Sequence, residues 1–399
     1  MASVEDTETD EARVLALTGQ LLREFDPSKV PAGDFLGRQF DLGLAWVHHP
    51  EGLGGLGLSP KLQRLVNERV FAAGAINPMT VNPMGYGMGA PTIATHGSLA
   101  QRRRYLRPIF TCEELWCQMF SEPGAGSDVA GLGTRAVRDG DEWIINGQKV
   151  WTSLAHRARW GMLLARTDPD MPKHKGLSYF VIDMHQPGVE VRPLRQINGE
   201  AEFNEVYFTD ARIADEERMG AVGDGWRVAI TTLMNERVSI GGAIAPRGSG
   251  LIGQAVALYQ ERAAGDAARR DQLMQFWIRA EILRLTNVRA AANRNASNPG
   301  PEGSIAKLAM AELNKELTAF VVELLGSEGM LLGDHYDHPR TEHPQGRPSL
   351  QKQFLRARAN SIEGGTSEVM RNILGERTLG LPGDVRVDKD VPWSAVPKN

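Results

Sequence analysis

The chain has 399 residues but very little cysteine, with only Cys112 and Cys117. The two stand five positions apart and lack the further cysteine and histidine partners that a zinc site needs. So few cysteines also argue against a disulfide-stapled secreted fold. We therefore expect two free, buried thiols in the reducing environment of the cytoplasm.

Long apolar runs and blocks of like charge are also missing. No apolar run approaches the roughly 20 residues of a membrane-spanning helix. The acidic start, MASVEDTETDEARV, lacks the apolar region of a signal peptide. The net charge of −4 supports neither nucleic-acid binding nor a polybasic membrane patch. The sequence thus predicts a soluble intracellular protein with no membrane span and no nucleic-acid partner.

The histidines are poorly arranged for holding a metal. His335, His338 and His343 share one polar loop, but their spacing matches no helix-borne ligand pair such as H-E-x-x-H. His48 and His49 precede a proline and are expected to be structural. No metal site is predicted.

Hydrophobic residues make up 42% of the chain, enough to fill two or three domains. Helical spacing of apolar residues runs over 11–25, 62–73 and 94–110, so the first third is predicted to be mainly helical. Residues 52–57 satisfy G-x-G-x-x-G, but Pro60 stands where the helix of a dinucleotide-binding unit should be running. We interpret this stretch as a glycine-rich turn.

From about Trp116 the pattern changes to short runs typical of strands, separated by turn signals that include 139–141 and 146–147. The expected strands are 142–145, 161–166, 177–183, 189–193 and 205–209. Beyond Gly225 helical patterns return, at 226–264, 267–296, 303–327 and 349–378. The predicted class is α+β and mainly α. Its domains are an N-terminal helical domain over 1–116, a central antiparallel β domain over 117–222 and a C-terminal helical bundle over 223–399.

One short window combines glycines and small hydroxyl side chains. Residues 123–128 read PGAGSD, a tight loop whose backbone can approach a ligand closely because glycine carries no side chain. A phosphate or a carbonyl group would fit there. Taken alone, this loop is as well explained by an ordinary turn.

Several separated motifs extend this observation. The chain carries S-E-P-G-A-G-S-D at 121–128, I-N-G-Q-K-V-W-T-S at 145–153 and N-E-R at 235–237, followed by L-L-G-S-E-G at 324–329 and E-G-G-T-S-E-V-M-R-N at 363–372. With these motifs in this order, the sequence resembles the acyl-CoA dehydrogenase family over nearly its whole length. The resemblance implies a C-terminal four-helix bundle, bound FAD, and a homo-oligomer, either a dimer or a tetramer, with a hetero-oligomer as the alternative.

The same resemblance assigns roles around the flavin. Phe120 and Ser121 are expected against the isoalloxazine, with Ser121 bonded to its pyrimidine edge. Ser127 is expected to reach the pyrophosphate and the substrate. Trp151 should flank the dimethylbenzene side, while Ser153 approaches N5.

Other contacts are implied farther along the chain. Thr366 and Glu368 match flavin contacts of the family, and Arg237 matches a substrate-binding arginine. Arg262 and Gln272 are expected to hold the ADP half of the FAD of a partner subunit. There the chain departs from the family pattern R-x-x-F-G, because it reads RAAG at 262–265.

The catalytic base has two candidates. In much of the family a glutamate stands immediately before G-T-S, but that place is Gly364 here, and the glutamate is Glu363. A shift of one residue moves a carboxylate by several ångströms, whereas proton transfer needs heavy atoms within about 3 Å. A subset of the family places its base just before the substrate-binding arginine, which matches Glu236. We favour Glu236, with Glu363 and a chain without any base as the alternatives.

The resemblance implies α,β-dehydrogenation of an acyl-CoA thioester to the trans-2-enoyl-CoA, with electrons passed to an electron-transfer flavoprotein. The base is expected in an apolar pocket, and the Gly364 N–H is expected to polarise the thioester carbonyl. Two alternatives stay open. One is an acyl-CoA oxidase that uses oxygen. The other is a non-catalytic subunit that supports FAD in a hetero-oligomer. The sequence does not indicate whether the acyl group is straight, branched, aromatic or steroid.

Overall fold

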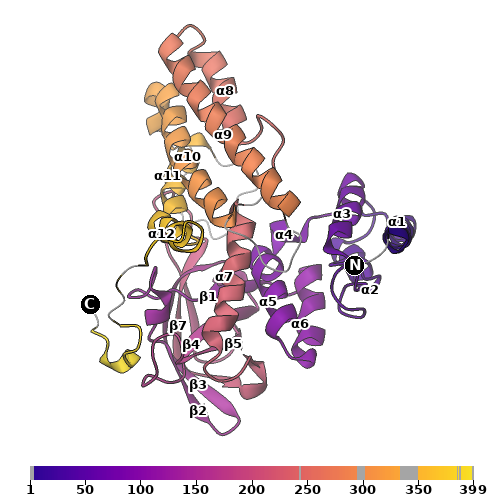
Figure 1. Ribbon diagram of the computed structural model, residues 1–399, viewed down its shortest axis with the longest axis vertical. Helices are drawn as coiled ribbons and strands as arrows, with labels where there is room; N and C mark the ends of the chain where they lie inside the picture. The colour runs from indigo at the N-terminus through magenta and orange to yellow at the C-terminus, as the bar shows by residue number, and fades with distance from the viewer. Residues whose placement is uncertain are drawn as a thin grey trace.

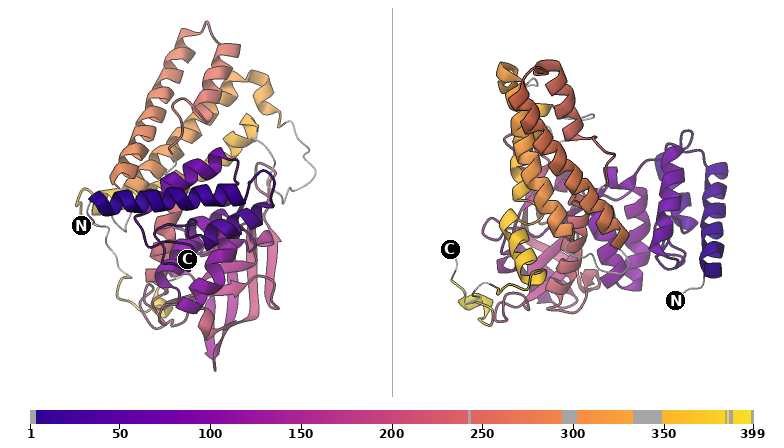
Figure 2. Two further views of the ribbon diagram at one scale, coloured as in Figure 1. Left: turned by 90° about the vertical axis from the view of Figure 1, so that its right-hand side faces the viewer. Right: turned by 45° about the horizontal axis from the view of Figure 1, so that its top comes forward.

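The computed structural model describes residues 4–241, 244–293, 302–332, 349–383, 385 and 388–397. Helices come first, a β-sheet follows, and helices return, so the predicted fold class is confirmed. The N-terminal helices lie on one side of the sheet and the C-terminal residues on the other, while the long helices rise above it (Figures 1 and 2).

The N-terminal helices form a layer beside the sheet. The longer ones are α1 (Val4–Glu24), α2 (Ala32–Asp41), α3 (Gln63–Ala72), α5 (Ala90–His96) and α6 (Leu99–Thr111). The single helix predicted over 94–110 is wrong, because the chain breaks at Gly97. There Ser98 caps α6 by accepting from the Gln101 N–H at 3.1 Å, and Gln101 accepts from the Ser98 N–H at 2.8 Å. This capping box favours a new helix start over a continuous helix.

The glycine-rich stretch after α2 is a turn, as predicted. Gly52, Gly54 and Gly57 all have positive φ values, between 69° and 83°. Glu51 and Gly55 form an isolated bridge. No helix follows directly, so this segment is not a dinucleotide-binding unit.

The central domain is one eight-stranded sheet in the order β6-β7-β3-β2-β4-β5-β8, with β1 paired to β4. Its strands are β1 (Trp116–Met119), β2 (Arg135–Asp139), β3 (Glu142–Ser153), β4 (Trp160–Arg166), β5 (Leu177–Asp183), β6 (Val189–Pro193), β7 (Phe203–Ala214) and β8 (Arg218–Met219). The pairings are antiparallel except for β1–β4 and the single pair that joins β2 to β4. The β2–β3 hairpin lies between β1 and β4 in the chain and supplies the long crossover that a parallel pair requires.

Alternate residues of the inner strands enter different cores. Met162 of β4 and Tyr179 of β5 pack with the N-terminal helices. Leu163 and Phe180, one position later, belong to a second cluster on the other face of the sheet. Strands buried on both faces read as continuous apolar runs, and this explains the sequence of β4 and β5.

Asn146-Gly147 is not the turn that its sequence suggests. Both residues lie inside β3, at a shift in the β3–β7 register between Ile145 and Gly147. Gly147 has φ 151°, and a Cβ at this position would lie 2.5 Å from the Thr134 hydroxyl oxygen. The glycine is therefore needed for close packing at a β-bulge rather than for a chain reversal.

The C-terminal helices are α7 (Gly225–Gly241), α8 (Leu251–Arg262), α9 (Ala267–Asn293), α10 (Glu302–Leu324), α11 (Leu350–Ala357) and α12 (Ser367–Arg377). The helix predicted over 226–264 is wrong, because Pro246 and the positive-φ residues Gly248 and Gly250 separate α7 from α8. The stretch over 349–378 is likewise divided, by the turn at Gly364–Gly365. Helix α10 contacts all the other helices of this group and forms the centre of the bundle.

Within the described part of the chain, no helix is long and apolar enough to cross a membrane. Across the same residues, no group of three or more His, Cys, Asp and Glu is placed to hold a metal ion. His335, His338 and His343 lie outside the described residues. Cys112 and Cys117 are free thiols, as predicted, and burial raises the pKa of Cys112 to about 11.

His49 is buried beside Trp46, and the structure describes no hydrogen-bond partner for its Nδ1. Burial and the neighbouring His48 lower the pKa of His49 from 6.5 to about 4. At a pH between these two pKa values, the His49 imidazole binds a proton in the unfolded chain but not in the folded chain. The free energy of unfolding therefore falls as the pH falls from 6.5 to 4. We predict that His49→Gln removes up to roughly 3 kcal/mol of this acid sensitivity.

Urea denaturation of the wild type and His49→Gln at pH 7 and pH 4.5 measures this effect. His185→Gln is the control, since its histidine lies at the exposed end of β5. Parallel loss of stability in all three proteins on acidification would contradict the prediction.

Candidate active site

The PGAGSD loop leaves the end of β1 and is fixed at its base. The Ser121 carbonyl accepts from the Val150 N–H of β3 at 2.9 Å. Glu122 and Ala125 exchange two backbone hydrogen bonds of 3.0 Å. Beyond this base the loop is exposed, and a Cβ on Gly124 or Gly126 would meet no atom within 4 Å. The outer side of the loop therefore has room for a ligand.

A buried ion pair ties this loop to the sheet. Lys149 of β3 is completely buried, and its Nζ donates to Glu122 at 2.8 Å and to the Phe120 carbonyl at 3.0 Å. The Glu122 carboxylate also accepts from the N–H groups of Gly133 at 2.7 Å and Thr134 at 2.9 Å. Burial opposes the charge on Glu122, but Lys149 and these donors hold its pKa below the ordinary value. Both ends of the loop are thus held by one carboxylate.

A bulge in β3 turns one side chain out of the sheet. The β3–β7 register shifts between Lys149 and Thr152, and Trp151 has φ 61°. The Trp151 side chain is 60% exposed, and its ring meets the edge of Phe203 at 6.0 Å. Ser153 lies half-buried two residues later. An indole held out of the sheet in this way offers a flat apolar face to a ring system.

Phe120 is placed differently from its expected contact with the isoalloxazine. Its ring is buried in the core and meets Tyr179 edge-on at 5.8 Å. A contact between Phe120 and a ligand in front of the loop must therefore come from the backbone. Ser121 and Ser127 keep accessible surface, Ser121 half-buried and Ser127 exposed.

A turn before α12 forms the opposite side of the site. Gly364 and Gly365 have φ values of 62° and 92°, which favour glycine. Thr366 then caps α12 by accepting from the Val369 N–H at 3.2 Å. Glu368 is exposed on the first turn, where a helix N-terminus stabilises negative charge.

The two candidate bases have different surroundings. Glu236 lies half-buried on α7, and its carboxylate accepts from the Gln118 side chain of β1 at 3.3 Å. Arg237 follows it on α7, but its side chain lies outside the described residues. The contact with Gln118 places Glu236 beside the strand that leads into the PGAGSD loop.

Glu363 is held in an ion pair. Both of its oxygens accept from Arg356, at 3.1 and 2.7 Å, and Asn360 donates a third hydrogen bond at 2.8 Å. The Arg356 guanidinium also lies over the Phe203 ring, 5.4 Å from its centroid. Phe203 in turn packs against Trp151. Glu363 therefore supports the exposed indole through Arg356 and Phe203.

A single buried lysine lies among these groups. Lys307 of α10 is completely buried and donates to the Gly365 carbonyl. Burial lowers its pKa, while the negative charges of Glu363 and Glu236 oppose this shift. The structure thus brings both candidate bases and the Gly364–Gly365 turn around one cation.

Arg262 and Gln272 lie far from this group, near the α8–α9 turn at the opposite end of the bundle (Figure 1). The Arg262 guanidinium binds both oxygens of Glu328, at 3.1 and 3.0 Å, and also contacts Glu261. Gln272 accepts from Arg269 at 3.3 Å. The arginine expected to hold a nucleotide phosphate is therefore already neutralised within its own chain.

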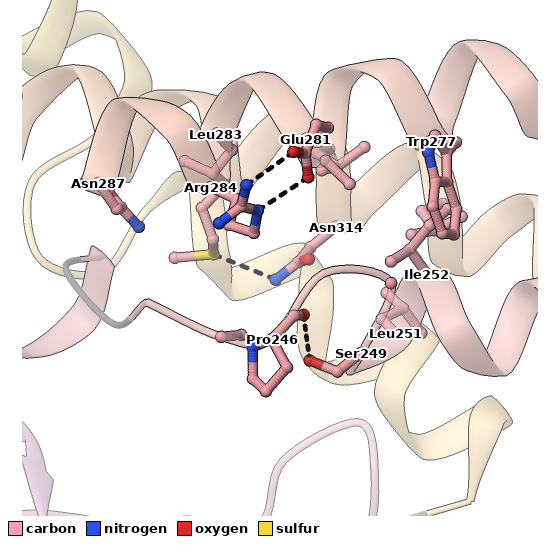
Figure 3. Close-up of a pocket in the computed structure, with 16 residues that line it drawn as sticks. Pro246, Ser249, Leu251, Ile252, Trp277, Glu281, Leu283, Arg284, Asn287 and Asn314 are labelled. Carbon is pink, nitrogen blue, oxygen red and sulfur yellow. Dashed lines mark hydrogen bonds and ion pairs between the residues drawn. The ribbon is translucent and has the colours of Figure 1, made fainter. Parts of the chain in front are cut away.

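A cavity of about 220 Å³ inside the helical bundle is separate from the site (Figure 3). Its lining includes Ile252, Trp277 and Leu283, and Arg284 paired to Glu281 lies between Asn287 and Trp277. None of the residues predicted from the motifs lines it. A second cavity of about 210 Å³ adjoins it and includes Arg356 and Asn360, the partners of Glu363.

Comparison with known proteins agrees with this geometry. Family models match the chain in three parts: "Acyl-CoA dehydrogenase, N-terminal domain" over 21–113, "middle domain" over 117–211 and "C-terminal domain" over 223–379. The fold and site therefore define a flavin-dependent oxidoreductase. The chain belongs to the acyl-CoA dehydrogenase family.

Individual relatives give the same result. Acyl-CoA dehydrogenase IpdE1 of Mycobacterium tuberculosis is 40% identical over 356 residues, 86% of each chain. Acyl-CoA dehydrogenase FadE34 of the same organism is 40% identical over 348 residues, covering 86% of this chain but 45% of the relative. Among solved structures, the Tcur3481-Tcur3483 steroid ACAD superposes with a TM-score of 0.70 at 26% identity, over 94% of this chain and 98% of that one. The ChsE4-ChsE5 complex from Mycobacterium tuberculosis gives 0.68 at 26% identity, over 96% and 100%.

Members of this family use FAD, and the residues on this face fit its ring end. The exposed indole of Trp151 offers a flat surface, and the open loop at Gly124–Gly126 leaves room for close backbone approach. The other end fits less well, because Arg262 is paired with Glu328. The predicted ring side is therefore open to a ligand, whereas Arg262 on the predicted nucleotide side is already paired.

Motif reasoning missed three side chains that organise the site. In the sequence, Gln118 is only a polar residue at a position where the family often carries an aromatic one, and its contact with Glu236 was not predicted. Lys307 interrupts the apolar run SIAKLAMA, and a lone lysine there signals a buried cation. Arg356 carries no sequence signal, because its role depends on Phe203 and Glu363 meeting in space.

The Lys149–Glu122 pair allows a direct test. We predict that Lys149→Met lowers the free energy of unfolding by about 3–5 kcal/mol, because it leaves a buried carboxylate without its cation. It should also lower the FAD content of the purified protein, since the loop loses its anchor. Urea denaturation and flavin absorbance measure both effects.

The matched control is Arg64→Met, which breaks an exposed pair with Glu68. This change should cost no more than about 0.5 kcal/mol. Equal losses in the two variants would show that the buried pair does not anchor the loop.

Proposed function

We propose that the chain dehydrogenates an acyl-CoA thioester between Cα and Cβ, forms the trans-2-enoyl-CoA and uses Glu236 as the base. The observation that carries this assignment is the difference between the two glutamates. Glu363 accepts three hydrogen bonds from Arg356 and Asn360. These bonds engage both carboxylate oxygens, so Glu363 would have to leave Arg356 and Asn360 before it could approach a substrate carbon.

Glu236 is better placed to act as the base. It lies on α7 across from β1, where Gln118 bonds one oxygen of its carboxylate. Gln118 is neutral, so this hydrogen bond orients the carboxylate without adding a charge–charge contact. In this proposal Glu236 takes the proton from the α-carbon, and Gln118 keeps its carboxylate in the required orientation.

The thioester carbonyl would accept from the Gly364 N–H, which stabilises the negative charge that develops as the α-proton leaves. Lys307 supports this turn by donating to the Gly365 carbonyl. When bound, FAD supplies the acceptor for the β-hydrogen. Ser121, Trp151, Ser153, Thr366 and Glu368 would hold the flavin, while Ser127 and Arg237 would bind the substrate.

For the electron acceptor we propose an electron-transfer flavoprotein. The choice rests on family membership, and peroxide formation at the turnover rate would instead indicate an oxidase. The substrate we propose is a steroid-derived thioester. Its support is the similarity to one solved relative, the Tcur3481-Tcur3483 steroid ACAD. A cytoplasmic location and the domain boundaries after residues 116 and 222 are proposed on the sequence features given above.

The base assignment predicts opposite outcomes for two conservative changes. Glu236→Gln should slow anaerobic flavin reduction by about 10²–10⁴-fold, because it removes the proton acceptor. Glu363→Gln should keep reduction within about tenfold of the wild type, because it acts only through Arg356 and the Trp151 face.

Stopped-flow bleaching with short, branched, long and steroid-derived thioesters measures both rates. Each variant also needs its flavin content, which separates a lost base from a lost cofactor. If Glu363→Gln gave the larger loss at full flavin content, the assignment would be reversed. Full activity surviving both changes would favour the non-catalytic subunit.

We also propose that the chain works in an oligomer. Helix α9 exposes a stripe of large apolar side chains, each between 39% and 58% exposed: Met274, Ile278, Ile282, Leu285 and Val288. Their spacing of three and four residues puts them on one face of the helix. Unlike a scattered surface residue, a continuous stripe of this kind is typical of an interface.

The contacts of Arg262 favour a partner of different sequence. In a homo-oligomer, the nucleotide end of each FAD would meet an arginine already bound to Glu328. A different chain could supply an uncommitted cation. Two solved relatives, the Tcur3481-Tcur3483 steroid ACAD and the ChsE4-ChsE5 complex, are also named as pairs of different chains.

Ile282→Glu should dissociate this oligomer, because it places a charge in the middle of the apolar stripe. Native mass spectrometry of the protein purified from its own host measures the loss of mass and shows whether the partner chains are identical. Leu99→Glu, which places the same charge on an exposed apolar residue of α6, is the control. An unchanged mass in Ile282→Glu would exclude this face as the interface.

A further inference from the structure

The last described residues return to the β domain after leaving α12. They lie beside the sheet on the side opposite to the N-terminal helices (Figure 1). The family model ends at residue 379, so this segment is outside the part of the chain that the family shares. We refer to residues 388–396 as the C-terminal clasp.

The clasp is bonded to the turn between β4 and β5. The Trp393 N–H donates to the Met171 carbonyl at 3.0 Å, and the Ser394 N–H donates to the Pro169 carbonyl at 2.9 Å. Pro392 and Pro172, which flank the first of these bonds, form an isolated bridge. The clasp therefore pairs with this turn through its backbone, in the manner of a short strand.

The Trp393 side chain extends to the segment that follows the PGAGSD loop. We refer to residues 121–134, which include the PGAGSD loop, as the flavin loop. The Trp393 indole N–H donates to the Gly131 carbonyl at 2.9 Å. A Cβ on Gly133 would lie 3.6 Å from the indole ring. The Gly133 N–H is the same group that Glu122 binds at 2.7 Å. The loop is thus held between the buried ion pair on one side and Trp393 on the other.

Beneath the indole lies a buried arginine whose hydrogen bonds, among the described residues, all go to backbone carbonyls. Arg166 is 2% exposed and donates to the carbonyls of Ala130 at 2.6 Å, Leu132 at 3.2 Å and Lys173 at 3.0 Å. Its guanidinium lies 4.5 Å from the centroid of the Trp393 ring. Burial lowers the pKa of Arg166 to about 10. The aromatic face of Trp393 therefore covers a desolvated cation, where a cation–π contact is strongest.

Two ion pairs also join the clasp to the flavin loop, at the start of the clasp. The Lys173 ammonium binds Asp128 of the PGAGSD loop at 2.8 Å and Asp388 of the clasp at 2.6 Å. Asp128 directly follows Ser127. The loop, the β4–β5 turn and the clasp are thus joined by one lysine and one arginine.

We propose that the C-terminal clasp positions the flavin loop, with Trp393 as the positioning residue that fixes residues 128–133 against Arg166. The clasp also continues the chain from α12, whose first turn carries Thr366 and Glu368. The clasp therefore connects the two segments that would hold FAD, the flavin loop and the first turn of α12. This inference rests on the proposed function, because it assumes that residues 121–128 contact FAD.

The test compares full-length Trp393→Ala with the wild type by hydrogen exchange, after removal of FAD. The amides of residues 128–134 should exchange about tenfold faster in Trp393→Ala, because the indole cover and its hydrogen bond are lost. Once FAD is restored, its dissociation should be faster by a similar factor, about tenfold, since the loop is no longer held.

Two further variants keep the test decisive. Trp393→Phe retains the aromatic face over Arg166 and should restore most of the protection. Val385→Ala is the control, because Val385 precedes the clasp by three residues and is 91% exposed. A lower melting temperature in Trp393→Ala, with unchanged exchange at 128–134, would overturn the proposal and make the clasp a general stabiliser. If the wild type bound no FAD, the proposed function would fail, whereas the exchange result would still decide whether the clasp holds the loop.

Discussion

The buried ion pair between Lys149 and Glu122 joins the flavin loop to the sheet. One carboxylate receives the lysine and two backbone N–H groups, so the loop is closed at Gly133 and Thr134 while its tip stays open. A charge pair in a protein interior is tolerated only when its remaining hydrogen-bonding positions are satisfied. Both partners meet this condition, because Lys149 also binds the Phe120 carbonyl. The loop can therefore be glycine-rich and still be held in one place.

A second group of contacts holds the opposite side of the site. Glu363 neutralises Arg356, which covers the Phe203 ring, and Phe203 supports the exposed indole of Trp151. Glu363, which resembles the family's base shifted by one residue, therefore supports Arg356 and Phe203. The proton acceptor can then reside on α7, where Gln118 of β1 bonds the Glu236 carboxylate. In the proposed mechanism, the two glutamates divide support and chemistry between two elements of the fold.

Sequence patterns predicted the order of helices and strands, and the motifs located most of the segments that surround the site. They failed where local signals competed with tertiary packing. Asn146-Gly147 has the composition of a turn but forms a bulge, because Gly147 must fit against Thr134. The continuous helices expected across Gly97 and Pro246 are broken by a cap and by a proline. The clasp was not predicted, because the contact of Trp393 with Arg166 joins residues 227 positions apart in the chain.

The most direct test of the base assignment is a structure of the FAD-bound protein with a non-reactive acyl-CoA thioether. Our account predicts a Glu236 carboxylate oxygen roughly 3 Å from the atom that represents the α-carbon. Glu363 should still be bound to Arg356. A structure in which Glu363 leaves Arg356 and faces the α-carbon, while Glu236 stays turned away, would contradict it.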